Sequence, residues 1–278
     1  MALILDSNNI KYNTEIITNG YALSDDKLSF LAMHNCEKIQ ITLDGCKEMH
    51  DSRRVFCNGK PTFEKIITNM HIALDNNYIN KVSVRLNYDK QNVSSQVKLL
   101  DYLASEFDVN RIYISLGYVT DSAKEPSFDS YINNNIPGIN KEHIEAYISL
   151  YIHAKQLGFK MKKYYAINGI CISKRNHSIL MCADGNYYKC GGLVGRDDHS
   201  VGKVGSTLIP QSYHYPELYD KCFDKKCEMI PLCHSGCRLD AFNLKGRLNA
   251  LDCKYDLLKG INVALLRTNY VDIPSLKV

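Results

Sequence analysis

The sequence lacks any long apolar run. No stretch of its 278 residues approaches the ~18 consecutive apolar residues that a membrane-spanning helix needs. Its first residues, MALILDSNNIKYN, contain no basic segment, apolar core or small-residue cleavage site of a secretory signal. These absences argue against a membrane or secreted protein, so we expect a cytoplasmic chain with no membrane partner.

The sequence also lacks a strong charge of either sign, and it has no tryptophan. Its 34 lysine and arginine residues stand against 30 aspartate and glutamate residues, which leaves a formal net charge of +4. The lysines are scattered along the chain, whereas a nucleic-acid-binding protein concentrates its basic residues on one face. We therefore expect no nucleic-acid partner, and we attach no function to the missing tryptophan.

Cysteine, by contrast, is abundant, with eleven residues in the chain. An odd number cannot all pair as disulfides, and clustered thiols in a reducing compartment more often bind metal or carry redox chemistry. Short spacing lets a turn return each sulfur to one centre. The C-terminal part of the chain has seven cysteines in such a pattern: Cys171, Cys190, Cys222, Cys227, Cys233, Cys237 and Cys253. The pattern predicts a metal site rather than disulfides.

Two kinds of metal suit this pattern. The run C-x4-C-x5-C-x3-C from Cys222 to Cys237 could hold one tetrahedral zinc ion, and zinc stays open as an alternative. Seven thiolates with glycines nearby fit two cuboidal iron–sulfur clusters better than one tetrahedral ion. We therefore predict that this part of the chain binds iron and sulfide.

The first half of the chain alternates apolar strands with amphipathic helices. Strands are predicted at residues 13–18, 38–43, 81–87 and 111–119, and helices at 24–35, 62–74, 93–104 and 143–156. The apolar stripe of the helix at 62–74 consists of Phe63, Ile66, Ile67, Met70 and Leu74, and that of the helix at 93–104 consists of Val93, Val97, Leu100 and Ala104. The charged segment 48–54 is predicted as a loop, and 120–140 as a loop or lid. Strands that alternate with helices at this length indicate an α/β fold whose parallel sheet has right-handed crossovers.

A hairpin is predicted in the cysteine-rich half. The segment SILMCADGNYYKC has two apolar arms on either side of Asp184 and Gly185. An Asp-Gly pair between apolar arms is typical of a tight β-hairpin turn.

The order and spacing of several segments resemble the radical S-adenosylmethionine (radical SAM) enzymes. Three of them, ITNGYAL, IQITLDGCKEMHDSRR and VRLNYDKQN, resemble the middle of the radical SAM barrel. Two later segments, GNYYKC and PLCHSGC, are similar to the SPASM extension of members that modify peptides and proteins. The resemblance implies a partial (β/α) TIM-like barrel of about four parallel strands over residues 1–158, followed by a small cysteine-rich SPASM domain over 159–278.

The resemblance also implies a SAM site. Thr42 matches a strand-end hydroxyl that contacts SAM in the family, and Arg54 matches the arginine that pairs with the SAM carboxylate. A planar guanidinium can hold a carboxylate through two parallel hydrogen bonds. Asp44 and Asn87 complete the predicted cofactor-binding set. The alternative for Arg54 is a solvated loop ion pair with Asp51.

The family arrangement further implies two sets of cluster ligands. The expected ligands of one [4Fe-4S] cluster are Cys222, Cys227, Cys233 and Cys253, and those of another are Cys171, Cys190 and Cys237. The fourth position of the second set is either an open iron or Cys182. The sequence departs from the family in two places. C-x4-C stands where C-x2-C is usual, and no cysteine occurs between Cys57 and Cys171, where some members carry one just before the position of Cys171.

No residue is assigned a catalytic role. Some members carry a catalytic aspartate directly after the hairpin cysteine, where this chain has Gly191 and Gly192. Asp197 or Asp198 would have to stand in for that base, so oxidation assisted by a carboxylate is not the expected reaction.

The C-x3-C-x2-C loop of radical SAM enzymes is absent from the printed sequence. Its three thiolates leave one iron free to bind and reduce SAM, so we expect no reductive SAM cleavage by this chain alone. We expect the chain to be an N-terminally truncated product, the second piece of a split gene or a degenerate relative. SAM is accordingly expected as a cofactor if the missing segment is present.

Two functional hypotheses follow from the resemblance. In the first, the chain is the C-terminal portion of an enzyme that modifies a peptide or protein, with the clusters serving electron transfer or substrate binding and a flavodoxin or ferredoxin as reductant. In the second, it is a non-catalytic iron–sulfur or zinc binding partner or peptide-binding module. We favour the enzyme.

Overall fold

The computed structural model describes residues 2–119, 141–162, 171–175, 178–206 and 218–270. The chain divides into two compact units. Unit 1 comprises Met1–Val119 and Lys141–Lys162, and unit 2 comprises Thr120–Asn140 and Lys163–Val278. The functional boundary between residues 158 and 159 stays a prediction, and the expected lid at 120–140 lies outside the described residues. Within the described ranges, no helix combines the length and apolar character that crossing a membrane requires.

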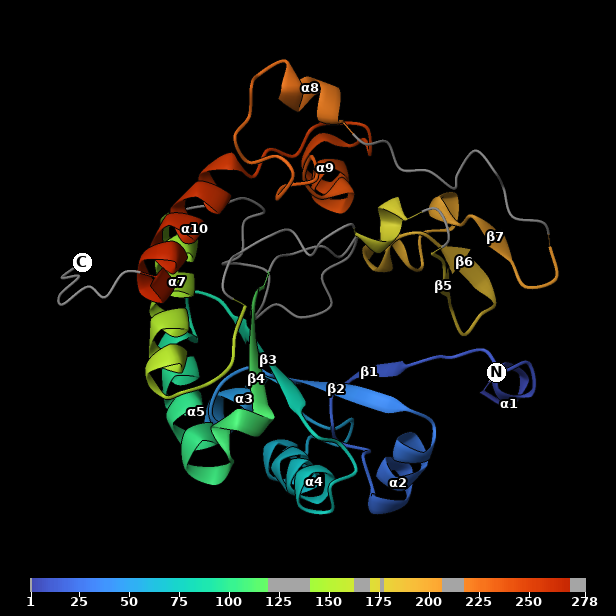
Figure 1. Ribbon diagram of the computed structural model, residues 1–278, viewed down its shortest axis with the longest axis vertical. Helices are drawn as coiled ribbons and strands as arrows, with labels where there is room; N and C mark the ends of the chain where they lie inside the picture. The colour runs from blue at the N-terminus through green and yellow to red at the C-terminus, as the bar shows by residue number, and fades with distance from the viewer. Residues whose placement is uncertain (1, 120–140, 163–170, 176–177, 207–217, 271–278) are drawn as a thin grey trace. The chain divides into compact units, whose positions relative to one another are not determined.

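Unit 1 is built on a four-stranded parallel sheet (Figure 1). The strands are β1 (Thr14–Thr18), β2 (Cys36–Leu43), β3 (Val82–Tyr88) and β4 (Ile112–Tyr118), paired in the order β1-β2-β3-β4. An isolated parallel bridge joins Tyr113 of β4 to Lys160. The sequence-based prediction of four parallel strands is confirmed.

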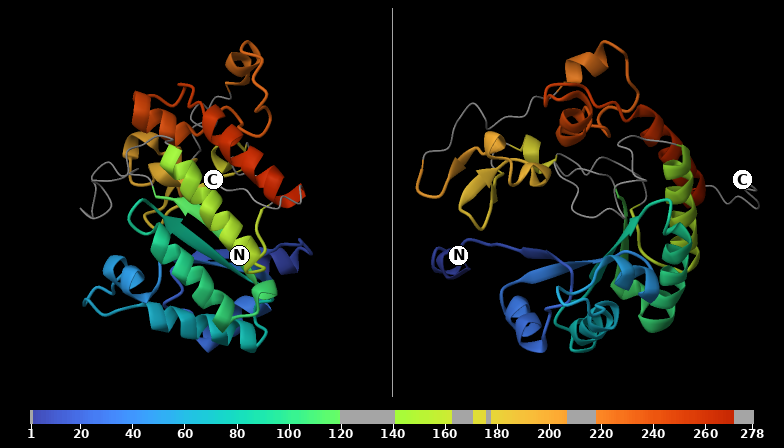
Figure 2. Two further views of the ribbon diagram at one scale, coloured as in Figure 1. Left: turned by 90° about the vertical axis from the view of Figure 1, so that its left-hand side faces the viewer. Right: turned by 180° about the vertical axis from the view of Figure 1, so that it is seen from behind.

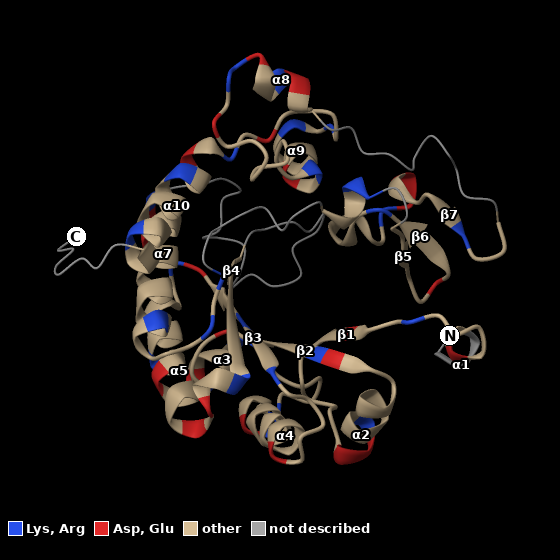
Figure 3. Cartoon of the chain, in the orientation of Figure 1, with Lys and Arg blue, Asp and Glu red and all other residues tan. Residues whose placement is uncertain are grey.

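Helices precede, connect and follow these strands. They are α1 (Ala2–Ser7), α2 (Asp25–Met33), α3 (Lys47–Arg53), α4 (Phe63–Asp75), α5 (Val93–Glu106) and α7 (Lys141–Gln156), with the short 3-10 helix η1 (Val109–Arg111) before β4. Helices α2, α4, α5 and α7 cover one face of the sheet, and α5 packs beside α7 (Figure 2). Lysine and arginine are interleaved with aspartate and glutamate along the described helices (Figure 3).

The core lies between the sheet and these helices. Alternate residues of β2 and β3, among them Ile39, Ile41, Val82 and Val84, are fully buried, as period-two strands with one covered face require. The apolar stripe predicted for α4 is buried, but α5 buries Leu99, Leu100 and Leu103 with Ser95 and Gln96, and Val93 and Val97 are only half-buried. The predicted buried face of α5 was wrong, because the polar side chains of Ser95 and Gln96 point inward and bind backbone groups.

Helix α3 corrects one prediction. Residues 48–54 were expected to form a loop, but Lys47–Arg53 is helical, with Cys46 at its N-cap position. The backbone amide of His50 donates to the carbonyl of Cys46 at 2.8 Å, and that of Arg54 donates to His50 at 2.8 Å. Because only His50 is buried in this helix, its sequence has no apolar stripe to reveal it.

The first strand lies at an edge of the sheet. Among the described residues β1 pairs only with β2, so its other edge is unpaired. Its side chains are half-buried or exposed, and Ile17 is 75% exposed. An unpaired edge with an exposed apolar side chain is a template for strand pairing with another chain.

Unit 2 contains a small antiparallel sheet and short helices. The sheet joins β5 (Leu180–Met181), β6 (Asn186–Tyr188) and β7 (Gly202–Lys203). The helices are α8 (Tyr219–Phe223), α9 (Arg238–Lys245) and α10 (Tyr255–Tyr270), with 3-10 turns η2 (Ile172–Lys174), η3 (Gly191–Leu193) and η4 (Asp197–His199). Gly185 has a φ of +82°, which a tight hairpin turn demands. The predicted hairpin is confirmed, and β7 was not predicted.

Candidate functional site

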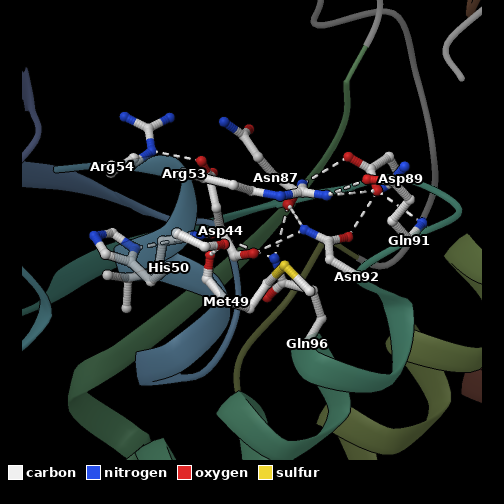
Figure 4. Close-up of polar contacts among 12 residues, drawn as sticks. Asp44, Met49, His50, Arg53, Arg54, Asn87, Asp89, Gln91, Asn92 and Gln96 are labelled. Carbon is white, nitrogen blue, oxygen red and sulfur yellow. Dashed lines mark hydrogen bonds and ion pairs between the residues drawn. The ribbon is translucent and has the colours of Figure 1, made fainter. Parts of the chain in front are cut away.

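Asp44 and Arg54 form an ion pair at the carboxyl ends of the parallel strands (Figure 4). Asp44 directly follows β2, and its side chain is fully buried. The Nε of Arg54 donates to Asp44 Oδ2 at 2.6 Å, while 34% of the arginine side chain remains exposed. The pair therefore has a buried anion and a cation that reaches solvent.

Asp51 caps helix α4 and is not the ion-pair partner of Arg54. It was a candidate ion-pair partner of Arg54, but its Oδ1 instead accepts the backbone amides of Thr62 and Phe63 at 2.7 and 2.9 Å. These amides open α4, where the first N–H groups have no partner within the helix. Asp51 therefore caps α4, and the carboxylate beside Arg54 is that of Asp44.

His50 lies buried beside this pair. Its Nδ1 accepts the backbone amide of Asp44 at 3.3 Å, and its Nε2 contacts Thr62 Oγ1 at 3.2 Å. Burial lowers the pKa of His50 from its ordinary value of 6.5 to about 4, although the nearby Asp44 acts in the opposite sense. At neutral pH the ring is therefore uncharged.

Arg53 and Asp89 form a second ion pair, which is buried on both sides. The Nη1 of Arg53 donates to Asp89 Oδ2 at 2.7 Å, and its Nη2 donates to Oδ1 at 3.1 Å. Their side chains are only 5% and 3% exposed. This bidentate pair attaches the end of α3 to the segment that follows β3.

Two amide side chains link the ends of β2 and β3. The Nδ2 of Asn92 donates to the carbonyls of Asp44 and Asn87 at 2.8 and 2.9 Å. The Nε2 of Gln96 donates to the carbonyl of Asn87 at 2.7 Å. Both amides come from the start of α5 and its N-cap, so this helix fixes the loops that carry the predicted site.

Thr42, Arg85 and Asn87 share the face of the sheet opposite the helices. Thr42 pairs in register with Arg85, and Asn87 lies two residues further along β3. The Nε of Arg85 donates to Asn87 Oδ1 at 3.0 Å. A Cβ added at Gly117 would lie within 2.3 Å of the Arg85 guanidinium, so the glycine gives this side chain room to lie across β4.

The structure thus brings the four predicted cofactor-binding residues to one end of β2 and β3. Sequence reasoning missed the partners that support them, namely His50, Thr62, Arg53, Asp89, Asn92 and Gln96. The paired arginines in HDSRR and the polar N-cap of α5 were visible signals. Their partners depend on packing between separate segments, which a single sequence does not give.

The predicted metal ligands in unit 2 are gathered near one another. Burial raises the pKa of the Cys222 thiol, and the nearby thiols of Cys227 and Cys253 raise it further. Burial also raises the pKa of Cys233, which has Cys222 and Cys253 as neighbours. These four cysteines form the first thiol group.

A second thiol group lies around η3 and the start of α9. Burial raises the pKa of Cys190, and Cys171 nearby contributes to the rise. Burial also raises the pKa of Cys237 to about 11, with Asp240 and Cys190 adding to it. Cys182 lies in the hairpin, where its backbone amide donates to the Asn186 carbonyl at 2.9 Å.

All eleven cysteines lie within the described residues, and all are free thiols. As they are placed there, no three His, Cys, Asp or Glu side chains converge closely enough to hold a metal ion. The donor chemistry nevertheless fits an iron–sulfur or zinc centre, because each group supplies several thiols and no competing disulfide. The ligand roles of these cysteines stay predictions.

One half-buried cation, Lys174, and one buried cation, Arg238, hold the loop between the thiol groups. Lys174 Nζ donates to the carbonyls of His234 and Gly236, the latter at 3.2 Å. Arg238 donates to the carbonyl of Ala250 at 3.0 Å and to that of Ser235. Gly236 has a φ of +80°, and an added Cβ would lie 1.8 Å from the carbonyl oxygen of Asp252. The loop that joins the two thiol groups is therefore tightly held.

The sequence and the fold of this chain resemble those of known proteins. No family model matches the chain. A sequence match nevertheless shows homology to radical SAM/SPASM enzymes over most of the chain. Several solved structures share its fold.

The individual relatives are as follows. The chain is 24% identical over 258 residues to the "Cysteine-type anaerobic sulfatase-maturating enzyme" of Clostridium novyi (strain NT), covering 82% of this chain and 66% of that enzyme. It thus spans just under two thirds of that relative's length. The solved structure of native anSMEcpe with bound AdoMet and Cp18Cys peptide matches at a TM-score of 0.66 and 16% identity, covering 95% of this chain and 75% of that one. Streptococcus suis SuiB bound to S-adenosylmethionine matches at 0.56 and 13% identity, covering 91% and 61%. These structural matches establish the shared fold.

Proposed function

We propose that this chain is the C-terminal portion of a radical SAM/SPASM enzyme that modifies a peptide or protein. The observation that carries the proposal is Arg54, whose guanidinium is held by buried Asp44 and partly exposed at the carboxyl ends of the strands. In open parallel sheets, ligands bind at those ends. Relatives with the same fold were solved with AdoMet and with peptide bound.

In this proposal the side chains of unit 1 bind and orient SAM. Arg54 holds the carboxylate through its terminal nitrogens, and Thr42 and Asn87 contact the ligand from the open face of β2 and β3. Asp44 is buried against Arg54, so it holds that arginine in place and does not itself contact SAM. The adjoining segments, fixed by Asn92 and by Arg53, exclude water from the base of the site.

The two thiol groups are the proposed ligands of one or two auxiliary [4Fe-4S] clusters. Such clusters supply electron transfer or an open iron that can bind substrate. The first group would hold one cluster, and the second, with Cys182 as a candidate fourth ligand, would hold another. Residues 1–158 would then serve SAM binding and 159–278 cluster binding, with a peptide substrate, a flavodoxin or ferredoxin as reductant, and a cytoplasmic location.

A non-catalytic role is the second candidate. The printed 278 residues contain no C-x3-C-x2-C triplet. A chain that binds SAM or peptide without that triplet would act as an iron–sulfur or zinc binding partner or peptide-binding module. Cofactor-orienting residues can position a ligand but cannot supply its redox chemistry.

The SAM site is tested by replacing Arg54. We expect Arg54→Ala to weaken SAM binding by about 1.5 to 3 kcal/mol, the scale of a hydrogen bond to a charged group. Isothermal titration calorimetry with the 278-residue chain measures the change. Lys38→Ala removes an exposed cation that pairs with Glu15 on β1 and should leave the affinity unchanged. Equal affinities of wild type and Arg54→Ala would refute the proposed SAM site.

The metal is tested by anaerobic purification followed by iron, sulfide and zinc analysis. We expect iron and acid-labile sulfide in the wild type and a clear loss of both in Cys222→Ser, because a four-thiolate cluster loses a ligand. Cys57→Ser is the matched control, since Cys57 is exposed and lies in unit 1. About one zinc per chain with no labile sulfide would contradict the cluster assignment and favour the zinc alternative.

A further inference from the structure

Four residues around the Asp44–Arg54 pair form a closed ring of hydrogen bonds. The Asp44 amide lies 3.3 Å from His50 Nδ1, and His50 Nε2 lies 3.2 Å from Thr62 Oγ1. Thr62 Oγ1 donates to the Arg54 carbonyl at 2.5 Å, and Arg54 Nε donates to Asp44 Oδ2 at 2.6 Å. The ring joins the end of β2, helix α3 and the N-cap of α4.

The ring has one consistent direction. The Thr62 hydroxyl donates its only hydrogen bond to the Arg54 carbonyl, so its oxygen accepts a hydrogen bond from the N–H at His50 Nε2. His50 is then left with an unprotonated Nδ1, which accepts the Asp44 amide. Each residue donates once and accepts once, and a single histidine tautomer satisfies all four. Asp44, His50 and Thr62 are buried, so only the Arg54 guanidinium leaves the ring toward solvent.

The ring fixes both ends of Arg54. Thr62 holds its backbone carbonyl, and Asp44 holds its Nε. The two terminal nitrogens point away from Asp44 (Figure 4). A guanidinium that is bound at Nε can still present this terminal edge to a carboxylate through two N–H groups.

We propose that Asp44, His50 and Thr62 are positioning residues that lock the Arg54 guanidinium for the SAM carboxylate. This inference rests on the proposed function, in which Arg54 binds that carboxylate. A long side chain that is already ordered loses less conformational freedom when the ligand binds. Simple electrostatics predicts instead that removing the Asp44 charge strengthens SAM binding, because that charge repels a bound carboxylate. The effect of removing that charge therefore separates positioning from charge balance.

The experiment is a titration of SAM and of decarboxylated SAM into a set of variants. We expect Asp44→Asn and Thr62→Val each to weaken SAM binding about three- to tenfold, the cost of ordering one long side chain. Thr62→Ser keeps the hydroxyl and should bind as the wild type does. Neither loss should appear with decarboxylated SAM, which has no carboxylate for Arg54. Neither should appear when Arg54 is already alanine, because then nothing remains to be positioned.

The outcomes separate this inference from the proposed function. If Arg54→Ala binds SAM as tightly as the wild type, or the wild type binds no SAM, the proposed function fails and this inference fails with it. If Arg54→Ala loses affinity but Asp44→Asn and Thr62→Val do not, or Asp44→Asn binds more tightly, only the positioning role is overturned. The same holds if their losses persist with decarboxylated SAM. Should Asp44→Asn not fold, Thr62→Val against Thr62→Ser decides the question.

Discussion

Replacing Arg53 with methionine is expected to lower the free energy of unfolding by about 3 to 5 kcal/mol, the cost of leaving one buried charge without its partner. The stranded charge is Asp89, whose side chain is 3% exposed. Methionine keeps much of the length of the arginine stem, so the loss reports mainly the missing guanidinium. Asp89→Asn should be destabilising for the same reason, since it leaves Arg53 buried without an anion.

Urea denaturation followed by far-UV circular dichroism measures this loss, and hydrogen exchange of the α3 amides assigns it to unit 1. Lys47→Met is the matched control. Lys47 also lies in α3, and it pairs with Glu64 at 2.8 Å, but the two side chains are 52% and 64% exposed. An exposed pair contributes about 0 to 1 kcal/mol. Equal stabilities of Arg53→Met and Lys47→Met would show that the buried pair does not stabilise the fold.

Acidification is expected to destabilise unit 1 through His50. The pKa of His50 is about 4 in the folded chain against an ordinary value of 6.5, because burial disfavours the charged ring. Between these two values the unfolded chain binds a proton that the folded chain does not. The free energy of unfolding therefore falls as pH falls through this window, by about 3 kcal/mol in total at pH 4. Above pH 6.5 this contribution is absent.

The His50→Gln variant isolates this term, since glutamine has no titrating group. Stability curves of wild type and variant between pH 4 and 7.5 should converge as pH falls, because the wild type alone loses the His50 contribution. Other groups titrate in both proteins and cancel in the difference. Parallel curves over the whole range would mean that the pKa of His50 is the same in the folded and unfolded chains, so that burial does not lower it.

Sequence periodicity predicted the sheet because local pattern is enough for that purpose. Alternating strands and helices imply parallel strands joined by right-handed crossovers. The order β1-β2-β3-β4 fits the partial barrel that the family resemblance implied. Helix α3 escaped prediction because only His50 is buried in it. Polar residues on the buried face of α5, such as Gln96, misplaced its predicted stripe because they bind backbone groups that are distant in the sequence.

The candidate site was predictable only as a set of segments. The motif around Arg54 predicted which residues gather at the ends of β2 and β3, but not that Asp44 is the carboxylate beside Arg54. That partner depends on how the end of β2 meets α3 and the N-cap of α4, through His50 and Thr62. Likewise, the family resemblance divided the cysteines into two sets, and which metal they hold stays a prediction that chemical analysis decides.

The open edge of β1 has a consequence for how the chain folds. Register partners throughout the sheet are far apart in sequence: Thr14 of β1 pairs with Cys36, Ile39 with Val82, and Val82 with Ile112. Sheets assembled from such distant contacts fold slowly, because each connecting segment must lose entropy on closing before its strands form stabilising contacts. Until then, the exposed edge around Ile17 can pair within its own chain or with a neighbouring chain. Folding yield therefore depends on chain concentration, since only the second reaction accelerates when molecules are crowded together.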